Sequence, residues 1–430
     1  MRVLISGAGI AGPTLAYFLA KTGASITVIE RSPELLPNGH SIDIKGSAVA
    51  VIKKMGLIES IREAYTSEKG SHFIGSDEKL VAAFPVREGM GGTLSANYEI
   101  LRADLAGILY KASKGLANVE YRFGQTIEEV VSNDKDSVTV RLDNAEVLNY
   151  DLLVLADGQW SRTRQLVFPS KDLTVIDKNM YGAYWTIPQA IQDDEWRKIY
   201  IGLQSRIVST RPDPYGGTRA LVTTMPCSDA EREAWQGVSR KGKTAQLELL
   251  KEKFADAGWQ TQKLLDEAEG SPDFHFQPVQ QIKMATWSSE RVVCLGDTAY
   301  APSPLTGMGT SLAILGAYVL AGELSKFTTS TSSISSSTSS SSSSAEEHPR
   351  RALQEYERKL RPFVEETQKI PSFIPAVAHP KTAFKRDLLH GFLWTVAKVC
   401  DGLALVPWVV RMFDREDKED FPLPRYERLD

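Results

Sequence analysis

The chain has 430 residues, enough for two or three domains, and its 42% apolar and 24% charged residues are ordinary for a globular protein. Its net charge of -4 offers no broad basic surface, which argues against nucleic acid as a partner. The three cysteines are far apart, and no cluster of metal-ligating residues is visible, so we expect no disulfide framework, no metal and a cytoplasmic location.

The first thirty residues predict a strand, a tight turn, a helix and a second strand. Apolar residues recur at helical spacing from Ala11 to Thr22, and a β-branched run covers Ser25 to Ile29. Three glycines between the first strand and the helix would let a pyrophosphate approach the helix N-terminus, and an acidic residue ends the second strand, where it can bind ribose hydroxyls. A glycine-rich turn without a ligand is the alternative. The predicted dinucleotide contacts are Gly7, Gly9, Ile10, Ala11, Gly12, Glu30 and Arg31.

The middle of the chain predicts two helices, further strands of the first sheet and then a change in sequence pattern. The helices are expected over 46–65 and 98–117, and short alternating runs follow up to Leu155. Asp157-Gly158 ends an apolar strand and precedes Ser161 and Arg164, which makes a compact polar corner or an ordinary helix cap. Alternating aromatic and polar segments between about 170 and 280 predict a separate antiparallel sheet, with a helix from about Lys243 to Ala257.

A second strand–loop–helix motif follows this sheet. The apolar run 292–295 ends in Gly296-Asp297, and a proline-stiffened loop leads to Gly307, Gly309 and a helix over 310–324. Asp297 can accept hydrogen bonds from a polyol chain, and the two later glycines allow a flat ring to approach the backbone. The helix N-terminus then faces any negative charge that develops there, as at N1–C2=O of a reduced flavin. A turn without a ligand is the alternative.

These three motifs together resemble those of the single-component FAD-dependent aromatic hydroxylases, the relatives of para-hydroxybenzoate hydroxylase and of the tetracycline-inactivating monooxygenases. The resemblance covers about residues 1–325. It implies that NADPH or NADH reduces a bound FAD transiently, and that O2 then forms a flavin C4a-hydroperoxide that oxygenates a substrate. Tyr300 and Ser311 depart from the His and Asn usual in the family. The further FAD contacts that it implies are Arg102, Asp157, Asp297, Pro304, Gly307, Met308 and Gly309.

The fold class that follows is α/β, with a Rossmann-type FAD-binding domain split in sequence, an inserted antiparallel β-sheet substrate domain and a C-terminal helical segment. We expect the FAD-binding domain to comprise residues 1–70, 98–170 and 276–325, and the substrate domain 71–97 and 171–275. A Ser/Thr-rich disordered insertion is expected at 326–348, with a phosphorylated loop as its alternative, and a helical segment at 349–430. The apolar stretch 388–413 is interrupted by Lys398, Asp401, Pro407 and Arg411, which favours a packed or interfacial helix over a membrane anchor.

The predicted function is hydroxylation or epoxidation of a small organic substrate, aromatic or polycyclic and typical of secondary metabolism, with NAD(P)H and O2. A flavoprotein reductase or oxidase without oxygen insertion is the first alternative, and a non-catalytic protein on the same fold is the second. Candidate catalytic residues are His40 and Asp43, from a loop that the resemblance places beside the flavin, and His275, a possible general base. For His275 a hydrogen-bonded strand histidine is the alternative. The substrate-binding candidates, whose aromatic members could also be core residues, are Tyr184, Trp185, Arg206 and Met225.

Overall fold

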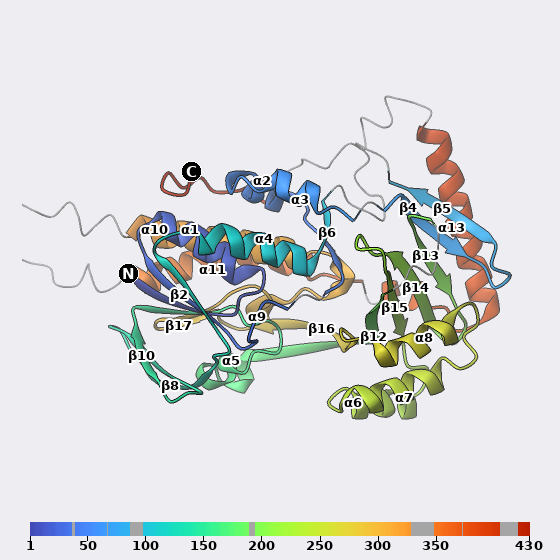
Figure 1. Cartoon of the computed structure of the whole chain (residues 1–430), viewed down its shortest axis with the longest axis horizontal. Helices are drawn as coiled ribbons and strands as arrows, with labels where there is room; N and C mark the ends of the chain where they lie inside the picture. The colour runs from blue at the N-terminus through green and yellow to red at the C-terminus, as the bar shows by residue number, and fades with distance from the viewer. Residues whose placement is uncertain are drawn as a thin grey trace, which may run out of the picture.

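The computed structural model describes residues 1–36, 39–66, 68–86, 98–188, 194–327, 348–371, 373–404 and 420–430. The Ser/Thr-rich tract from Thr328 to Ser344 lies outside these residues, as does the part of the apolar stretch that follows Ala404. Within them, the chain builds two large sheets that lie side by side, each with its own helical cover (Figure 1).

A six-stranded sheet forms the predicted nucleotide-binding half. Its central strands are buried along their whole length because other layers cover both faces, which explains their continuous apolar sequence. All neighbouring pairs are parallel except β17 with β18. The strands run in the order β17 (Ser288–Ser289), β18 (Val292–Cys294), β11 (Leu152–Leu155), β1 (Arg2–Ser6), β2 (Ser25–Glu30) and β7 (Val119–Phe123).

Helices cover one face of this sheet, and a three-stranded meander lies on the other (Figure 1). The predicted first helix is confirmed as α1. The helix expected over 46–65 is in fact two short helices, because Gly56 takes a left-handed conformation (φ +72°) between them. The elements are α1 (Ala11–Lys21), α2 (Ser47–Lys54), α3 (Ile58–Glu63), α4 (Arg102–Lys114), α10 (Gly309–Phe327) and α11 (His348–Thr367), and the meander β8 (Ile127–Asn133), β9 (Val138–Leu142) and β10 (Val147–Tyr150).

A seven-stranded sheet forms the other half. Its strands pair antiparallel as expected, except that β4 pairs parallel with β13, since β4 comes from a separate stretch of chain. The last strand, β16, pairs with β12 along its length, so residues 276–284 lie in this sheet, beyond the predicted boundary at 275. The strand order is β16 (His275–Met284), β12 (Leu173–Ile187), β15 (Thr218–Thr224), β14 (Arg206–Pro212), β13 (Trp196–Ile201), β4 (Gly70–Ile74) and β5 (Leu80–Pro85).

The two faces of the seven-stranded sheet have different covers. On the face that we call the back, alternate residues such as Trp185, Val208 and Val222 form an apolar core. Three helices complete that core, where the sequence predicted one: α6 (Asp229–Val238), α7 (Lys243–Lys253) and α8 (Thr261–Gly270). The opposite face, which we call the front, faces the predicted flavin motifs at one end.

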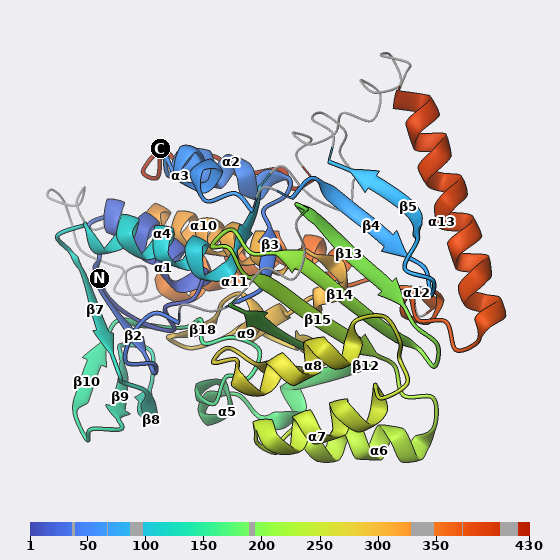
Figure 2. The same ribbon diagram turned by 45° about the vertical axis from the view of Figure 1, so that its right-hand side comes forward.

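The C-terminal helices cover the far end of the front face (Figure 2). α12 (Phe373–Ala378) leads into α13 (Ala383–Ala404), which runs along β5 at the outer edge. Ala397 of α13 is buried against Phe73, Ala82 and Ile199. None of the helices in the described part of the chain is long and apolar enough to cross a membrane. The final residues return to the half that contains the six-stranded sheet, where Tyr426 is buried against α10.

Candidate active site

The glycine loop after β1 leaves no room for side chains. A Cβ at Gly7 would collide with the carbonyl oxygen of Ala156, and one at Gly12 would collide with the carbonyl oxygen of Gly7. Ile10 is the N-cap residue of α1 and Ala11 its first residue, and no side chain caps this helix. The helix start therefore offers backbone N–H groups and a positive dipole to an anion.

Glu30, at the end of β2, holds this loop in place. Its carboxylate accepts hydrogen bonds from the backbone N–H of Ala8 at 2.9 Å and of Ser32 at 3.0 Å. The neighbouring Arg31 is exposed. The predicted ribose acid therefore lies directly at the glycine loop, with a cation beside it.

Arg102 approaches the same loop from another part of the chain. It is the first residue of α4, directly after β6 (Glu99–Leu101), and its Nη2 atom lies 3.8 Å from the position that a Cβ on Gly9 would take. Its side chain is exposed, and its backbone N–H donates to the carbonyl oxygen of His40 at 3.1 Å. Arg102 thus places a cation at the loop and anchors the segment that carries His40 and Asp43.

The late motif forms a recess beside Arg102. Asp297 begins the short helix α9 (Asp297–Tyr300), and its side chain is exposed. The surrounding protein nevertheless disfavours the charged carboxylate and raises its pKa, and the positive charge of Arg102 opposes this shift. A side chain that meets solvent but is surrounded by protein lies in a concavity. A Cβ on Gly309 would lie 3.7 Å from Oδ1 of Asp297. The half-buried Met308 comes just before Gly309, the first residue of α10.

The loop between α9 and α10 exposes its backbone to the same recess. Pro304 begins the 3-10 turn Pro304–Thr306, and Gly307 ends this turn in a left-handed conformation (φ 62°). Pro304 and Gly307 are both exposed. The backbone at Gly307 is therefore accessible to a flat ligand.

The middle motif supports the late motif. Ser161 donates to Oδ2 of Asp157 at 2.8 Å, and burial raises the pKa of that carboxyl. Arg164, at the start of α5 (Thr163–Val167), donates to the carbonyl oxygen of Thr298 at 2.6 Å, and the N–H of Gly158 donates to the hydroxyl of Thr298 at 2.9 Å. The polar corner thus braces the turn that carries Asp297, and a direct contact of Asp157 with a cofactor stays a prediction.

The two departures from the family pattern have structural counterparts. The hydroxyl of Tyr300 is buried 3.0 Å from that of Tyr356 on α11, and a Cβ on Gly316 would collide with it. Ser311, in the first turn of α10, accepts a hydrogen bond from the N–H of Lys45 at 3.0 Å. Tyr300 therefore belongs to the packing behind the recess, whereas Ser311 fixes the segment at its mouth.

An aromatic cluster lies on the front face of the seven-stranded sheet. The ring of Tyr184 lies close to those of both His40 and His275, with centroid distances of 5.1 Å and 5.0 Å. Both histidines are exposed, but surrounding protein and Arg102 lower both pKa values, that of His40 to about 4. The structure thus brings three predicted residues together and keeps both imidazoles neutral near pH 7.

Two of the other substrate candidates lie elsewhere. Trp185 alternates with Tyr184 along β12, so it points to the back face, where its indole donates to the carbonyl oxygen of Leu264 at 3.1 Å. Arg206 is buried and donates to the carbonyl oxygens of Leu203 and Lys253. Both are corrections, because a strand alternates its side chains and the sequence did not show which ones the helices cover. Met225, half-buried just after β15, is outside the aromatic cluster.

Sequence reasoning missed several charged residues around the cluster. Arg219 on β15 donates to the carbonyl oxygen of Gly39, and Lys45 pairs with Asp43 at 2.9 Å. Arg211 on β14 pairs with the buried carboxylates of Glu68 and Glu99, joining the sheet to the β6 segment. For the two arginines, the available signal was a charged residue within a strand-like segment, and that pattern is equally typical of a solvated face.

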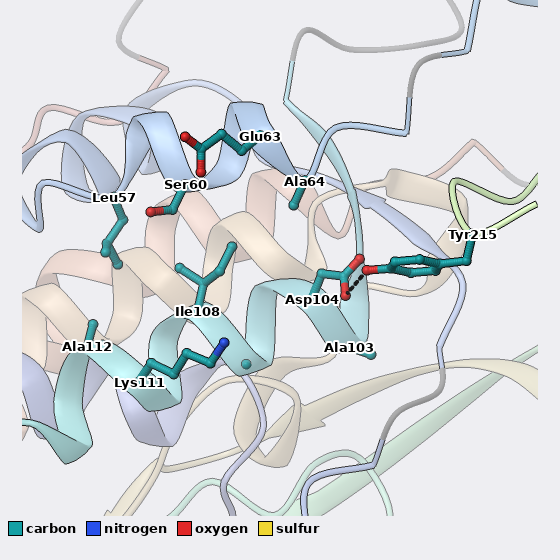
Figure 3. Close-up of a pocket in the computed structure, with 11 residues that line it drawn as sticks. Leu57, Ser60, Glu63, Ala64, Ala103, Asp104, Ile108, Lys111, Ala112 and Tyr215 are labelled. Carbon is teal, nitrogen blue, oxygen red and sulfur yellow. Dashed lines mark hydrogen bonds between the residues drawn. The ribbon is translucent and has the colours of Figure 1, made fainter.

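A separate hollow of about 700 Å³ lies between α3 and α4 (Figure 3). Tyr215 closes one side of it, where its hydroxyl donates to Asp104 at 2.9 Å. None of the residues predicted for the site lines this hollow. The hollow is therefore distinct from the recess at Asp297.

The recess and the glycine loop fit an FAD molecule. The Gly7–Gly12 backbone and the uncapped start of α1 suit a pyrophosphate, Glu30 suits a ribose, and Asp297 suits a ribityl chain. Comparison with known families agrees, since residues 1–354 match the family described as FAD binding domain. The chain belongs to this family of FAD-dependent monooxygenases.

Similarity to individual proteins extends over the whole monooxygenase. The chain is 32% identical to the FAD-dependent monooxygenase asL6 of Sarocladium schorii. The alignment of 450 residues covers 100% of this chain and 99% of that protein. The chain is 34% identical to the monooxygenase CTB7 of Cercospora beticola, over 86% of this chain and 85% of that one. The crystal structure of the tetracycline destructase Tet(55) superposes with a TM-score of 0.74 at 27% identity, covering 99% and 98% of the two chains. The predicted fold class and FAD cofactor are thereby confirmed.

In the described residues of this monooxygenase, no group of three or more histidine, cysteine or carboxylate side chains is placed to hold a metal ion. The assignment of each individual residue to FAD or substrate stays a prediction.

Proposed function

We propose that this monooxygenase uses NAD(P)H and O2 to hydroxylate or epoxidise an aromatic or polycyclic organic molecule. The observation that supports this most is the cluster of His40, Tyr184 and His275, which is open to solvent and lies close enough to Arg102 for that cation to lower both imidazole pKa values. A flat substrate stacked on Tyr184 would thus lie next to the recess assigned to FAD.

Bound FAD would supply the electron transfer from NAD(P)H and the activation of O2. The chain's own contribution is binding, orientation and exclusion of water. The glycine loop, Glu30 and Arg102 would hold the dinucleotide, and Asp297 would orient the chain that leads to the ring. The seven-stranded sheet and α13 would enclose the substrate from the other side.

The neutral imidazoles suit a substrate with an acidic hydroxyl group. A neutral histidine can accept a hydrogen bond or a proton from a phenol, whereas a protonated one can only donate. The pKa of the Tyr184 hydroxyl is raised by burial, so Tyr184 stays neutral and can donate. The cluster therefore offers both acceptors and a donor to a phenol or enol.

The names of similar proteins support a substrate of this class. The relatives from Sarocladium schorii and Cercospora beticola are fungal monooxygenases, and the solved structure at 27% identity is a tetracycline destructase, named for a polycyclic compound. These names apply to those proteins. They favour a polycyclic secondary metabolite for this chain as well.

The decisive experiment measures oxygen insertion. Purified enzyme with FAD is mixed with NADPH or NADH and a panel of phenols and polycyclic metabolites under isotopically labelled O2. We expect substrate-stimulated oxidation of the nicotinamide and one labelled oxygen atom in the product. Nicotinamide oxidation without label in any product would instead support the reductase or oxidase alternative.

A further inference from the structure

Lys45 lies at the exposed backbone of the late motif. Its Nζ atom is 3.3 Å from the position that a Cβ on Gly307 would take. Its side chain is 42% exposed, so the ammonium group borders open space and is not part of the packed core. Gly307 is one of the two glycines expected to face the flavin ring. Lys45 therefore places a positive charge where the ring is expected to lie.

The main chain around Lys45 is held from two distant parts of the sequence. Its N–H donates to the hydroxyl of Ser311 on α10 at 3.0 Å. Two residues later, the N–H of Ser47 donates to Asp420 in the C-terminal tail at 2.9 Å. This double anchoring limits the positions that the lysine side chain can reach.

The side chain itself is held by Asp43, the last residue of β3 (Ser41–Asp43). Its Oδ2 atom lies 2.9 Å from Nζ of Lys45, with 23% of the aspartate side chain exposed. An ion pair of this kind orients the ammonium and also offsets part of its field. Asp43 and Lys45 therefore act on a nearby ligand in opposite directions.

Helix α10 adds a positive dipole at the same place. It begins at Gly309, two residues after Gly307, and no acidic residue lies in its first turn. A cation near a helix N-terminus strengthens the attraction for an anion there. Reduction of a flavin leaves negative charge at N1–C2=O, on the pyrimidine side of the ring.

We propose that Lys45 contacts the pyrimidine side of the bound FAD ring and stabilises the negative charge of the reduced ring, while Asp43 positions the lysine and moderates its field. This assigns Asp43, expected from the sequence to be catalytic, to a positioning role. The proposal rests on FAD binding to this chain. It goes beyond the proposed function because it concerns the cofactor and not the substrate.

Sulfite binding to the oxidised holoenzyme tests this without turnover. Sulfite adds to N5 of the flavin and leaves negative charge at N1–C2=O, so its affinity reports the positive charge at that edge. We expect Lys45→Met to weaken sulfite binding by about tenfold, equivalent to about 1.4 kcal/mol. We expect Asp43→Asn to tighten it and Lys45→Arg to keep it near the wild-type value. The reduction potential of the bound FAD should move in the same directions.

Lys79→Met is the matched control. Lys79 pairs with Asp77 at 3.0 Å, with the same two-residue spacing, on the distant β4–β5 hairpin. It should leave sulfite affinity unchanged. Unchanged affinity in Lys45→Met, or weakening in both Lys45→Met and Asp43→Asn, would overturn the proposal. If Lys45→Met fails to retain FAD, Asp43→Asn and Lys45→Arg decide by the same criteria. The assay needs no NAD(P)H, O2 or substrate, so its outcome is independent of the test of oxygen insertion.

Discussion

The two faces of the seven-stranded sheet are made by the same strands and do different work. The back face packs Trp185, Val208 and Val222 into an apolar core with helices α6–α8. The front face carries Tyr184, Arg211 and Arg219, and faces the flavin motifs. Neighbouring residues on one strand thus pack into an apolar core on one side and border the predicted site on the other.

The charges of the front face are tied together across long stretches of sequence. Arg211 joins β14 to Glu68 and Glu99, and Arg219 joins β15 to the backbone of Gly39. These links fix the seven-stranded sheet to the segments that border the recess at Asp297. The front face therefore joins the two halves of the molecule, and we propose that it also binds the substrate. The following variants can separate these two roles.

A large loss of stability is expected on substitution of Trp185, on the back face. Trp185→Ala should lower the free energy of unfolding by about 3–5 kcal/mol, because it opens a cavity and leaves the carbonyl oxygen of Leu264 without its indole donor. Tyr184→Ala, one residue earlier, should cost less stability but reduce the yield of oxygenated product per nicotinamide oxidised. Urea unfolding and product analysis measure the two effects. Equal losses of stability at both positions would contradict the division between the faces.

Arg211 tests whether the front face is also a joint. Arg211→Met should destabilise the protein by about 3–5 kcal/mol, because the buried Glu68 and Glu99 would lose the guanidinium that pairs with both and keep only Arg197 nearby. Burial raises the pKa of Glu99 to about 7, so part of this loss should be recovered in mild acid as that carboxylate takes up a proton.

The control for Arg211 is an exposed ion pair of the same chemistry. Arg232 pairs with Asp229 on α6 at 2.9 Å, and Arg232→Met should cost about 0–1 kcal/mol. Thermal unfolding monitored by circular dichroism compares the two variants. A similar, small effect at both arginines would show that the buried cluster does not join the halves.

His275 tests the chemistry of the front face. His275→Gln should slow oxygenation of a phenolic substrate by about a hundredfold if its imidazole accepts the substrate proton. The matched control is His72→Gln. His72 lies on the distant strand β4, and its ring stacks on that of Trp196 with centroids 3.9 Å apart. Turnover rates under labelled O2 give the comparison. An unaltered rate in His275→Gln would leave it a strand histidine without a catalytic role.

The smallest effect concerns the acid stability contributed by His40. The pKa of His40 is about 4 in the folded protein, against an ordinary value of 6.5. Between pH 4 and pH 6.5, His40 is therefore protonated in the unfolded chain but neutral in the folded protein. Its stabilising contribution is complete above pH 6.5 and is lost as the pH falls toward 4. His40→Gln should therefore show a smaller drop in melting temperature from pH 7 to pH 4.5 than the wild type. An identical drop would contradict this shift.

The two halves also differ in how far the sequence could predict them. The glycine loop, Glu30 and the Asp297 motif were predicted because each depends on a short segment whose turns, caps and strand ends are local. The front face depends on pairing between strands far apart, so Tyr184 and His275 could be named but Trp185 and Arg206 were assigned to the wrong side. The partners of Asp43 and Arg211 come from separate segments and gave no local signal.

By itself, the sequence determined the cofactor class, because backbone geometry for a dinucleotide requires glycines and an acidic residue at fixed local spacing. It also determined the existence of a second sheet, through alternating strands. Only the tertiary structure decided which face of that sheet meets the recess. It also decided that Lys45 lies next to Gly307 and that Arg211 pairs with two buried carboxylates. Those placements depend on contacts across hundreds of residues, where strand register and helix cover, and not local pattern, select the neighbours.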